Sequence, residues 1–259
     1  METLFLTMFF ILGTIMGSFY HVVATRLSND ESIITPGSHC PKCNHFLKWY
    51  ENIPIISYII QKGKCRNCHS RIPISYLVVE IITGLLFMAC YHAYNLSIDL
   101  IISLIFTSSL IIVIVSDIEY MIILDEVLIV STLAIILIYL FSNGFTMDGL
   151  TETTLHIYHG IASFLAMYGV KILGDKAFKK ESLGGGDIKL MFLFGLVIGF
   201  PMAVCSIFIA TFIAFPISLF ILFSDRENII PFGPFLSIAA ILILVTKLNL
   251  TDILNFLIK

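Results

Sequence analysis

Charged residues are scarce in this sequence. Only 13% of the 259 residues are Asp, Glu, Lys or Arg, whereas a soluble domain carries about 25%. Hydrophobic residues make up 58% of the chain, and the mean hydropathy is +0.97. Such a chain cannot cover its own surface for water, which excludes a soluble globular protein. Apolar stretches close to the ~20 residues that cross a bilayer recur along its length, so the sequence predicts an integral membrane protein.

A surplus of positive charge is also missing. The formal net charge is −3 and no basic stripe is present, so the lipid bilayer is an expected partner and nucleic acid is not. The first residues, METLFLTMFFILGTIMGSFY, lack the basic region and the A-x-A-like cleavage site of a signal peptide. We therefore interpret them as a retained first transmembrane helix.

The apolar segments predict an all-α, polytopic membrane protein of about eight transmembrane helices. The sixth is short, and its break from the seventh lies near Pro201. Between the first two spans lies the largest polar segment, which is a candidate extramembrane module. We accordingly divide the chain into a first helix at 1–24, a loop domain at 25–74 and a transmembrane core at 75–259. The predicted spans are 3–24, 75–95, 98–116, 121–141, 155–174, 187–200, 201–223 and 232–249.

Basic residues predict the orientation. Most of them lie in the loop 25–74 or around a second polar segment, 171–189, and the positive-inside rule places both segments in the cytoplasm. Four predicted spans separate the two, an even number, which agrees with a shared side. The segment 142–154, with no Lys or Arg, is expected outside, as are both termini. The protein itself is expected in the cell (inner or plasma) membrane. The basic residues concerned are Arg26, Lys42, Lys48, Lys62, Lys64, Arg66, Arg71, Lys171, Lys176, Lys179, Lys180 and Lys189.

Four of the six cysteines form two C-x-x-C pairs, CPKC at 40–43 and CRNC at 65–68. Two such knuckles supply the four thiolates that suit tetrahedral zinc, at close to the usual spacing. The cytoplasm disfavours structural disulfides, and a polar loop without its own core gains folding energy from a metal. The loop therefore predicts a structural zinc, with a redox dithiol pair or four free thiols as alternatives. The predicted ligands are Cys40, Cys43, Cys65 and Cys68, while His39, His45 and His69 are interpreted as solvated.

Two aspartates stand at predicted membrane edges on the cytoplasmic side. Asp117 closes the third span in VIVSDIEYMIILDEV, and Asp187 opens the sixth in SLGGGDIKLMFLFG. An ionisable residue at an apolar boundary is costly and indicates a functional site. Two neighbouring carboxylates share a proton, so one can activate water while the other polarises a peptide carbonyl. We therefore predict an aspartic peptidase in which Asp117 and Asp187 are catalytic.

Gly184, Gly185 and Gly186 precede Asp187. Glycine lets another chain approach closely, so these residues are candidates for substrate binding beside the carboxylate. Alternatively, the glycines are an ordinary loop and Asp187 caps a helix. Asp117 could likewise be a charge at a helix end that faces the headgroups.

The motifs together resemble those of the type IV prepilin leader peptidases, which belong to the GxGD-type membrane aspartic proteases. The resemblance runs through most of the chain in order. Its motifs are GSFYHVVATRL at 17–27, CPKC at 40–43, WYENIPIISY at 49–58, GKCRNC at 63–68, ISYLVVEIITG at 74–84, the SDIEY aspartate, GGGDIKL at 184–190 and PFGPFLSIAA at 231–240.

This resemblance implies about eight membrane helices, a cytoplasmic zinc-bound loop and catalysis by Asp117 and Asp187. It implies that prepilin or pseudopilin substrates lose a short basic leader just after a glycine. In many members the same enzyme then methylates the new N-terminus with S-adenosylmethionine. Because no glycine-rich cofactor loop follows a predicted strand, no residue is assigned to the cofactor.

Glu51, Asn52 and Glu80 fall in family motifs and could orient the substrate amine or the cofactor. Alternatively, Glu51 is solvated and Glu80 pairs with a basic loop residue such as Arg71.

One departure concerns the turn after Asp117, where the family often has Pro-Asp or Pro-Asn and this chain has Leu124-Asp125. It loosens the expected turn and leaves Asp125 as a competing catalytic acid. A rival interpretation is a non-enzymatic zinc-binding membrane transporter or assembly scaffold. A transporter would need polar residues through its spans, and these spans are nearly free of charge away from their ends.

Overall fold

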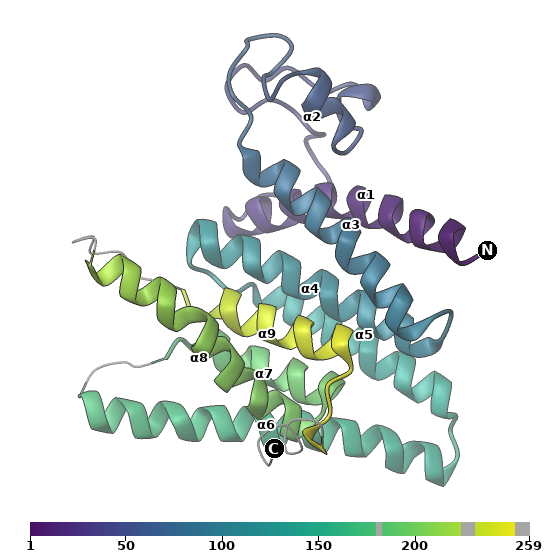
Figure 1. The fold of residues 1–259 in the computed structure, drawn as a ribbon, viewed down its shortest axis with the longest axis vertical. Helices are drawn as coiled ribbons and strands as arrows, with labels where there is room; N and C mark the ends of the chain where they lie inside the picture. The colour runs from purple at the N-terminus through teal and green to yellow at the C-terminus, as the bar shows by residue number, and fades with distance from the viewer. Residues whose placement is uncertain (180–182, 224–230, 252–259) are drawn as a thin grey trace. The chain divides into compact units, whose positions relative to one another are not determined.

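The computed structural model describes residues 1–179, 183–223 and 231–251, and within these ranges the chain is built from α-helices (Figure 1). The all-α membrane architecture is confirmed. Lys180, one of the basic residues used above, and the last eight residues lie outside the described part. The chain forms two compact units, Met1–Asn95 and Leu96–Lys259. The finer division at 24 and 74 stays a prediction.

The first unit is a pair of packed helices, α1 (Glu2–Ser28) and α3 (Ile74–Tyr94). Glycines let the two backbones approach closely, because a Cβ at Gly13 would lie 2.6 Å from the carbonyl oxygen of Thr83. Residues 29–73 connect the helices and form what we call the four-cysteine module. It contains a short 3-10 helix, η1 (Trp49–Glu51), and a one-turn helix, α2 (Ile56–Ile60).

The second unit is a bundle built around one largely buried helix. Its core is α7, which contacts every other helix of the unit, and Phe194 of α7 meets Phe106 of α4 edge to face with ring centroids 5.7 Å apart. In Figure 1, α9 (yellow) lies beside α4 and α7. The helices are α4 (Ile98–Tyr120), α5 (Asp125–Asn143), α6 (Met147–Phe178), α7 (Gly185–Ile198), α8 (Phe200–Phe223) and α9 (Gly233–Thr246).

Six helices in the described part are long and apolar enough to cross a membrane: α1, α3, α4, α5, α6 and α8. Together with α7 and α9 they occupy the positions of the eight predicted spans. However, α7 and α9 have 14 residues each, about 21 Å of helix, which is shorter than a bilayer core of ~30 Å. The chain is thus a multi-pass membrane protein with two short internal helices.

Helix α6 differs most from its expected extent. The range predicted for it, 155–174, is too narrow, because the helix begins at Met147 and runs to Phe178. The hydroxyl of Thr146 accepts a hydrogen bond from the amide of Gly149 at 3.2 Å and caps the helix. Acidic residues at a helix start, here Asp148, are favourable, so a polar segment that looked like a loop is helical.

The boundary between α7 and α8 falls at Gly199, two residues before the predicted break. Gly199 has φ of +78°, a conformation that costs little only for glycine. Pro201 then lies in the first turn of α8, where its missing amide hydrogen would have no helical partner in any case.

Candidate active site

Asp117 lies in the last turn of α4, with only 6% of its surface exposed. Helix α4 is capped by the residue that follows it, Met121, which adopts the left-handed conformation at φ 56° and donates its amide hydrogen to the Asp117 carbonyl at 3.0 Å. Leu124 is extended and α5 begins at Asp125. The turn therefore forms without the proline that the family often has there.

Asp187 is the third residue of α7 and is 7% exposed. Its carboxylate accepts a hydrogen bond from the amide of Gly184, the residue that precedes the helix. A side chain at this position commonly reaches back in this way. The Oδ1 atom of Asp187 is buried and has no hydrogen-bond partner within the described residues. A buried carboxylate oxygen without a partner is costly, and it is open to a proton, a water molecule or a substrate.

The two aspartates converge through a chain of contacts in the second unit. A Cβ at Gly233, the first residue of α9, would overlap Oδ2 of Asp117 and lie 3.2 Å from Cδ1 of Ile123. The same Cδ1 atom lies 2.9 Å from the Cβ position of Gly186, the residue before Asp187. The end of α4 and the starts of α7 and α9 therefore meet at one place.

Electrostatics favour a shared proton at this place. The charge of Asp117 acts on Asp187, and two buried carboxylates that repel each other ionise one at a time. The starts of α7 and α9 point their amides at the pair, and the Gly233 amide lies in hydrogen-bond reach of Asp117. Helix starts favour negative charge, so one carboxylate can stay ionised while its neighbour holds the proton.

The three glycines before Asp187 differ in their surroundings. Among the described residues, a Cβ on Gly185 would meet no atom within 4 Å, and a Cβ on Gly184 would meet only Oδ2 of Asp187, at 3.5 Å. Gly186 instead packs against Ile123, with its Cβ position 2.7 Å from that of Ile123. No other described residue crowds Gly184 or Gly185, whereas Gly186 serves the packing of the α4–α5 turn on α7.

Asp125, the competing candidate for the catalytic acid, forms an ion pair with another residue. Its carboxylate pairs with the ammonium group of Lys189, with distances of 2.6 and 2.8 Å to the two oxygens. Both side chains are about half exposed, 50% for Asp125 and 52% for Lys189. The geometry therefore favours Asp117 over Asp125 as the partner of Asp187.

Glu51 and Glu80 both lie in the first unit and are buried there. An Oε atom of Glu51 accepts a hydrogen bond from the Lys48 amide at 2.8 Å and lies 3.4 Å from Nε2 of His45. The hydrogen bond from Lys48, followed by the contact with His45, lowers the pKa of Glu51. Glu51 is thus not solvated.

Glu80 accepts a hydrogen bond from the amide of Ile55 at 2.7 Å, and no ion pair with Arg71 is found among the described residues. Ile55 has φ of 62°, which is rare and strained for a β-branched residue. Glu80 of α3 therefore stabilises an unusual turn of the module. The proposed contact of Glu51 and Glu80 with substrate stays a prediction.

The four module cysteines gather in one cluster, with all sulfur atoms within 4.8 Å of one another. The sulfurs of Cys40 and Cys68 are 3.8 Å apart and those of Cys43 and Cys65 are 3.9 Å apart. A tetrahedron with metal–sulfur bonds of ~2.3 Å has edges of about 3.8 Å. The cluster therefore fits a metal ion bound by four thiolates.

The two knuckles that carry these cysteines have matching backbone geometry. In the first, the Cys40 amide donates to the His45 carbonyl, and the Asn44 amide donates to the Cys40 carbonyl. In the second, the Cys65 amide donates to the Ser70 carbonyl, and the His69 amide donates to the Cys65 carbonyl. All four hydrogen bonds measure 2.8 to 2.9 Å.

Burial opposes ionisation of Cys40, but hydrogen bonds from the backbone, Ser70 and Cys65 outweigh it and lower the pKa of its thiol to about 6. Burial and the hydrogen bonds with Cys40 and Cys68, in contrast, raise the pKa of Cys65 to about 11. The cluster therefore ionises one thiol first. A thiol that ionises readily is a ready metal ligand.

Two residues of the site were not singled out from the sequence: Gly233 and Ile123. Gly233 lies within the quoted motif PFGPFLSIAA, so the signal was present, but its contact with Asp117 joins segments more than a hundred residues apart. Ile123 is one isoleucine in an apolar run, and nothing in that pattern distinguishes it.

Comparison with known proteins gives two matching family models. Residues 11–94 match the bacterial peptidase A24 N-terminal domain, and residues 104–219 match the type IV leader peptidase family. A prepilin leader peptidase/N-methyltransferase of Bacillus subtilis is 34% identical over 92% of this chain and 92% of its own length.

Relatives with the same name occur in other bacteria. The Vibrio cholerae protein is 31% identical over 94% of this chain and 97% of its own length. The Myxococcus xanthus protein is 36% identical over 74% of this chain, and the match spans 56% of that relative. No solved structure matches the chain.

Proposed function

The chain belongs to the type IV leader peptidase family, and from this premise we propose that it cleaves the basic leader of prepilin-like proteins with Asp117 and Asp187 as its catalytic pair. The observation that carries the proposal is the convergence of two buried aspartates at the end of α4 and the start of α7. The free Oδ1 atom of Asp187 adds to it.

The chemistry follows from one ionised and one protonated carboxyl group. The ionised group takes a proton from water, and the oxygen of that water attacks the carbonyl carbon of the scissile peptide. The protonated group donates its proton to the carbonyl oxygen. When the tetrahedral intermediate collapses, the C–N bond breaks and the leaving amine takes up a proton. The helix starts beside the pair stabilise the negative charge that moves between the groups.

The substrate strand runs past Gly184 and Gly185 in this proposal. Neither position is crowded by other described residues apart from Asp187 itself, which supports the approach of an extended peptide to the backbone next to Asp187. A glycine before the scissile bond suits such a narrow approach. Pilins and pseudopilins, whose hydrophobic helix stays in the bilayer, are the proposed substrates, and the leader remains in the cytoplasm.

We place the site at the cytoplasmic face of the inner (plasma) membrane. Lys171 and Lys176 lie in the last turns of α6 and Lys189 lies two residues after Asp187. The opposite end of α6 carries Asp148 and Glu152, and the start of α4, whose last turn holds Asp117, carries Asp99. Cytoplasmic ends collect Lys and Arg.

The metal of the four-cysteine cluster is proposed to be zinc, with Cys40, Cys43, Cys65 and Cys68 as its ligands. Four thiolates close a tetrahedral shell and leave no position for water. The ion would therefore hold the two knuckles together and take no part in peptide hydrolysis.

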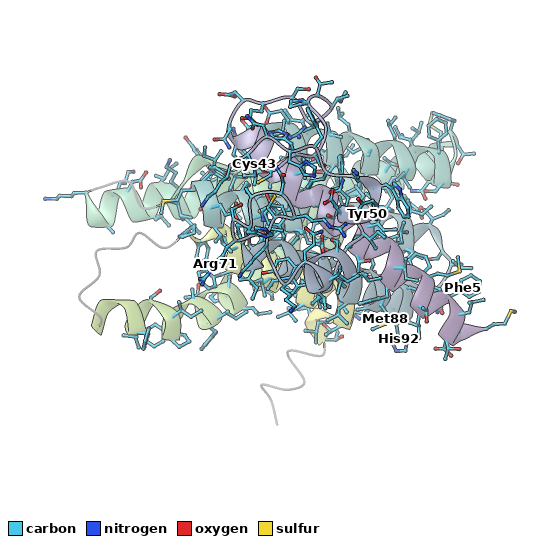
Figure 2. All side chains as sticks on the ribbon, turned by 90° about the horizontal axis from the view of Figure 1, so that it is seen from above. Phe5, Cys43, Tyr50, Arg71, Met88 and His92 are labelled. Carbon is cyan, nitrogen blue, oxygen red and sulfur yellow. The ribbon has the colours of Figure 1, made fainter. Side chains whose placement is uncertain are left out.

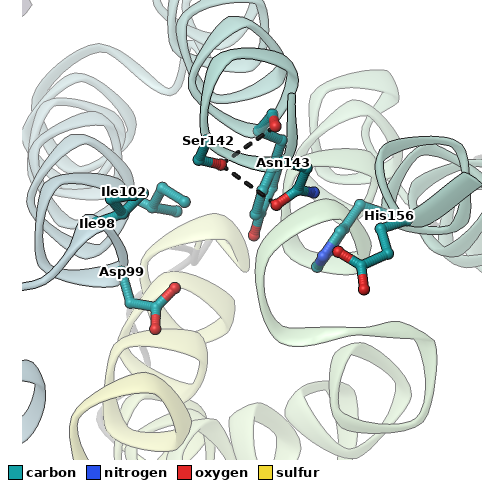
Figure 3. A pocket seen from close by; sticks show the side chains of 8 residues that line it. Ile98, Asp99, Ile102, Ser142, Asn143 and His156 are labelled. Carbon is teal, nitrogen blue, oxygen red and sulfur yellow. Dashed lines mark hydrogen bonds between the residues drawn. The ribbon is translucent and has the colours of Figure 1, made fainter. Parts of the chain in front are cut away.

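Methylation of the new N-terminus is proposed from the relatives, whose names include N-methyltransferase, with S-adenosylmethionine as methyl donor. The two described cavities do not fit this sulfonium compound. One, of about 350 Å³, is lined by Asp99, Glu152 and His156 (Figure 3), but Asp99 lies 18 residues before Asp117 on α4, about 27 Å away. The other cavity, described below, is lined by the cationic side chains of Lys62, Lys64 and Arg66, which would repel the positively charged sulfonium group. No step is assigned to this cofactor.

The test is co-expression of the chain with a prepilin-like protein, followed by mass measurement of the substrate's N-terminus. Asp117→Asn and Asp187→Asn should each abolish cleavage while the protein still inserts in the membrane. Asp99→Asn, the same change at the other end of α4, should leave cleavage intact. Cleavage by the Asp187→Asn variant would remove the catalytic assignment. A zinc-dependent transporter or scaffold, which family membership disfavours, predicts no cleavage by any form of the protein.

A further inference from the structure

A groove of about 550 Å³ crosses the surface of the four-cysteine module. Its apolar lining includes Ile53, Ile56 and Ile60, and its polar lining includes Lys62, Lys64 and Arg66. Among the described residues no Asp or Glu lines it. A lining that combines apolar and cationic side chains fits an amphiphile that carries negative charge.

Large apolar side chains are exposed beside this groove. Trp49 is 80% exposed and Ile60 is 72% exposed. Ile56 and Ile59 of α2 are also more than half exposed. A contiguous apolar patch with a polar edge marks an interaction surface.

Cation–π contacts with Tyr50 hold two cationic side chains, Arg66 and the neighbouring Lys48, beside the aromatic residues of this face. The ring of Tyr50 lies edge to face with Trp49, at 5.7 Å between centroids. The Arg66 guanidinium lies 5.3 Å from the Tyr50 ring and the Lys48 ammonium lies 6.0 Å from it. Lys62 and Lys64 form no ion pair within the part of the chain that the structure describes, so their charges are free for a partner.

The position of α2 relates this face to the membrane. The amide of Ile55, directly before α2, donates to Glu80 of α3, and the Tyr58 hydroxyl donates to the Ile72 carbonyl at 3.3 Å. Glu80 lies six residues after Ile74, the start of α3, which is about 9 Å along the helix. Helix α2 is therefore tied to the first two turns of a helix that enters the bilayer.

We propose that this face, formed by Trp49, Tyr50, α2, Lys62, Lys64 and Arg66, lies on the membrane surface and binds the headgroups of anionic phospholipids. Figure 2 shows the side chains of the module, with Tyr50 labelled. Tryptophan and tyrosine prefer the membrane interface, and clusters of Lys and Arg next to a transmembrane helix are attracted by anionic lipids. The isoleucines of α2 would enter the acyl boundary, as the apolar side of an interfacial helix does.

An anionic lipid fits better than an acidic protein segment, because the module is covalently joined to membrane helices at both ends. Because α1 and α3 are both long and apolar enough to cross the membrane, residues 29–73 stay close to its surface, where lipid is at high local concentration. A protein partner would need to displace that lipid first.

The test uses the full chain in lipid nanodiscs and its single tryptophan, Trp49, as the reporter. Nanodiscs of phosphatidylcholine alone are compared with nanodiscs that also contain phosphatidylglycerol, each prepared with or without brominated acyl chains. With phosphatidylglycerol, Trp49 emission should shift to shorter wavelength and bromine should quench it strongly. High salt should weaken the shift, because ions screen exposed charges.

Charge-reversing and charge-preserving variants distinguish the loss of positive charge on this face from misfolding of the module. Lys62→Glu/Lys64→Glu should lose most of the quenching, whereas Lys62→Arg/Lys64→Arg should retain it. Lys176→Glu/Lys179→Glu, with the same change in net charge at exposed positions outside the module, should behave like the unchanged protein. Quenching that is equal in both lipids, or that survives Lys62→Glu/Lys64→Glu, would overturn the role of anionic headgroups. Trp49 emission at the wavelength of a water-exposed tryptophan in both kinds of nanodisc would overturn the membrane contact itself. An acidic protein would then be the better candidate for the partner of this face.

Discussion

Gly233 and Asp117 touch: a Cβ atom on Gly233 would overlap the Oδ2 atom of Asp117. The contact joins the start of α9 to the end of α4, and only a residue without a side chain allows it. The position of one proposed catalytic carboxylate therefore depends on a glycine from another helix.

Gly233→Ala should push the Asp117 carboxylate away from Asp187. A displacement of about 1 Å at a reacting group costs roughly 10²-fold in rate, so leader cleavage should fall by about that factor. The measurement is the initial rate of cleavage of a co-expressed or purified prepilin-like substrate. Gly169→Ala in α6 is the matched control, because a Cβ there meets nothing within 4 Å. Equal rates for both variants would show that the contact does not position Asp117.

Asp125→Asn should leave cleavage within a few-fold of the unchanged protein. It removes the ion pair with Lys189, but both groups are about half exposed, and such pairs contribute roughly 0–1 kcal/mol. The cleavage assay and a thermal unfolding curve in detergent measure the two effects. Loss of cleavage as complete as in Asp117→Asn would instead make Asp125 a member of the catalytic pair.

Removal of the metal should unfold the four-cysteine module and leave the helix pair of α1 and α3 in place. A strong chelator, or Cys40→Ser with Cys65→Ser, should release one zinc ion per chain, measured by atomic spectroscopy. Limited proteolysis should then cut within residues 29–73. Cys90→Ser, which changes a buried cysteine outside the cluster, should keep the metal. A module that resists protease equally without metal would contradict the structural role.

Acid should destabilise the module through Glu51. Its pKa in the folded state is lowered, chiefly by the hydrogen bond from the Lys48 amide, relative to roughly 4.3 in an unfolded chain. The resulting stability is fully present above the unfolded pKa and is lost as pH falls through the folded pKa. A pH titration of Trp49 fluorescence should therefore show an acid transition that is reduced in Glu51→Gln. An identical transition in that variant would assign the effect to another group.

Much of the site could be predicted because its main residues stand at the edges of apolar runs. Asp117 and Asp187 interrupt long hydrophobic stretches, and two C-x-x-C pairs at zinc-like spacing are typical of a four-thiolate metal site. Each of these signals is local, so a single sequence suffices to find it.

Contacts between distant segments could not be predicted in the same way. The role of Gly233 depends on α9 packing against α4, and the role of Glu80 depends on a hydrogen bond from the amide of Ile55, 25 residues earlier. The start of α6 could not be predicted from the sequence for a different reason. Asp148 and Glu152 are polar enough to resemble a loop, yet acidic residues are favourable at the start of a helix.

The shortness of α7 and α9 has a consequence for the lipid around them. Both helices begin at the aspartate pair, and each is about 9 Å shorter than the ~30 Å hydrocarbon layer. The remaining depth is filled by the surrounding longer helices, by water or by locally thinner lipid, since neither helix can be stretched. Bilayer thickness thereby becomes a physical variable of peptide hydrolysis, because it sets how deep the scissile bond must descend to meet the two acids.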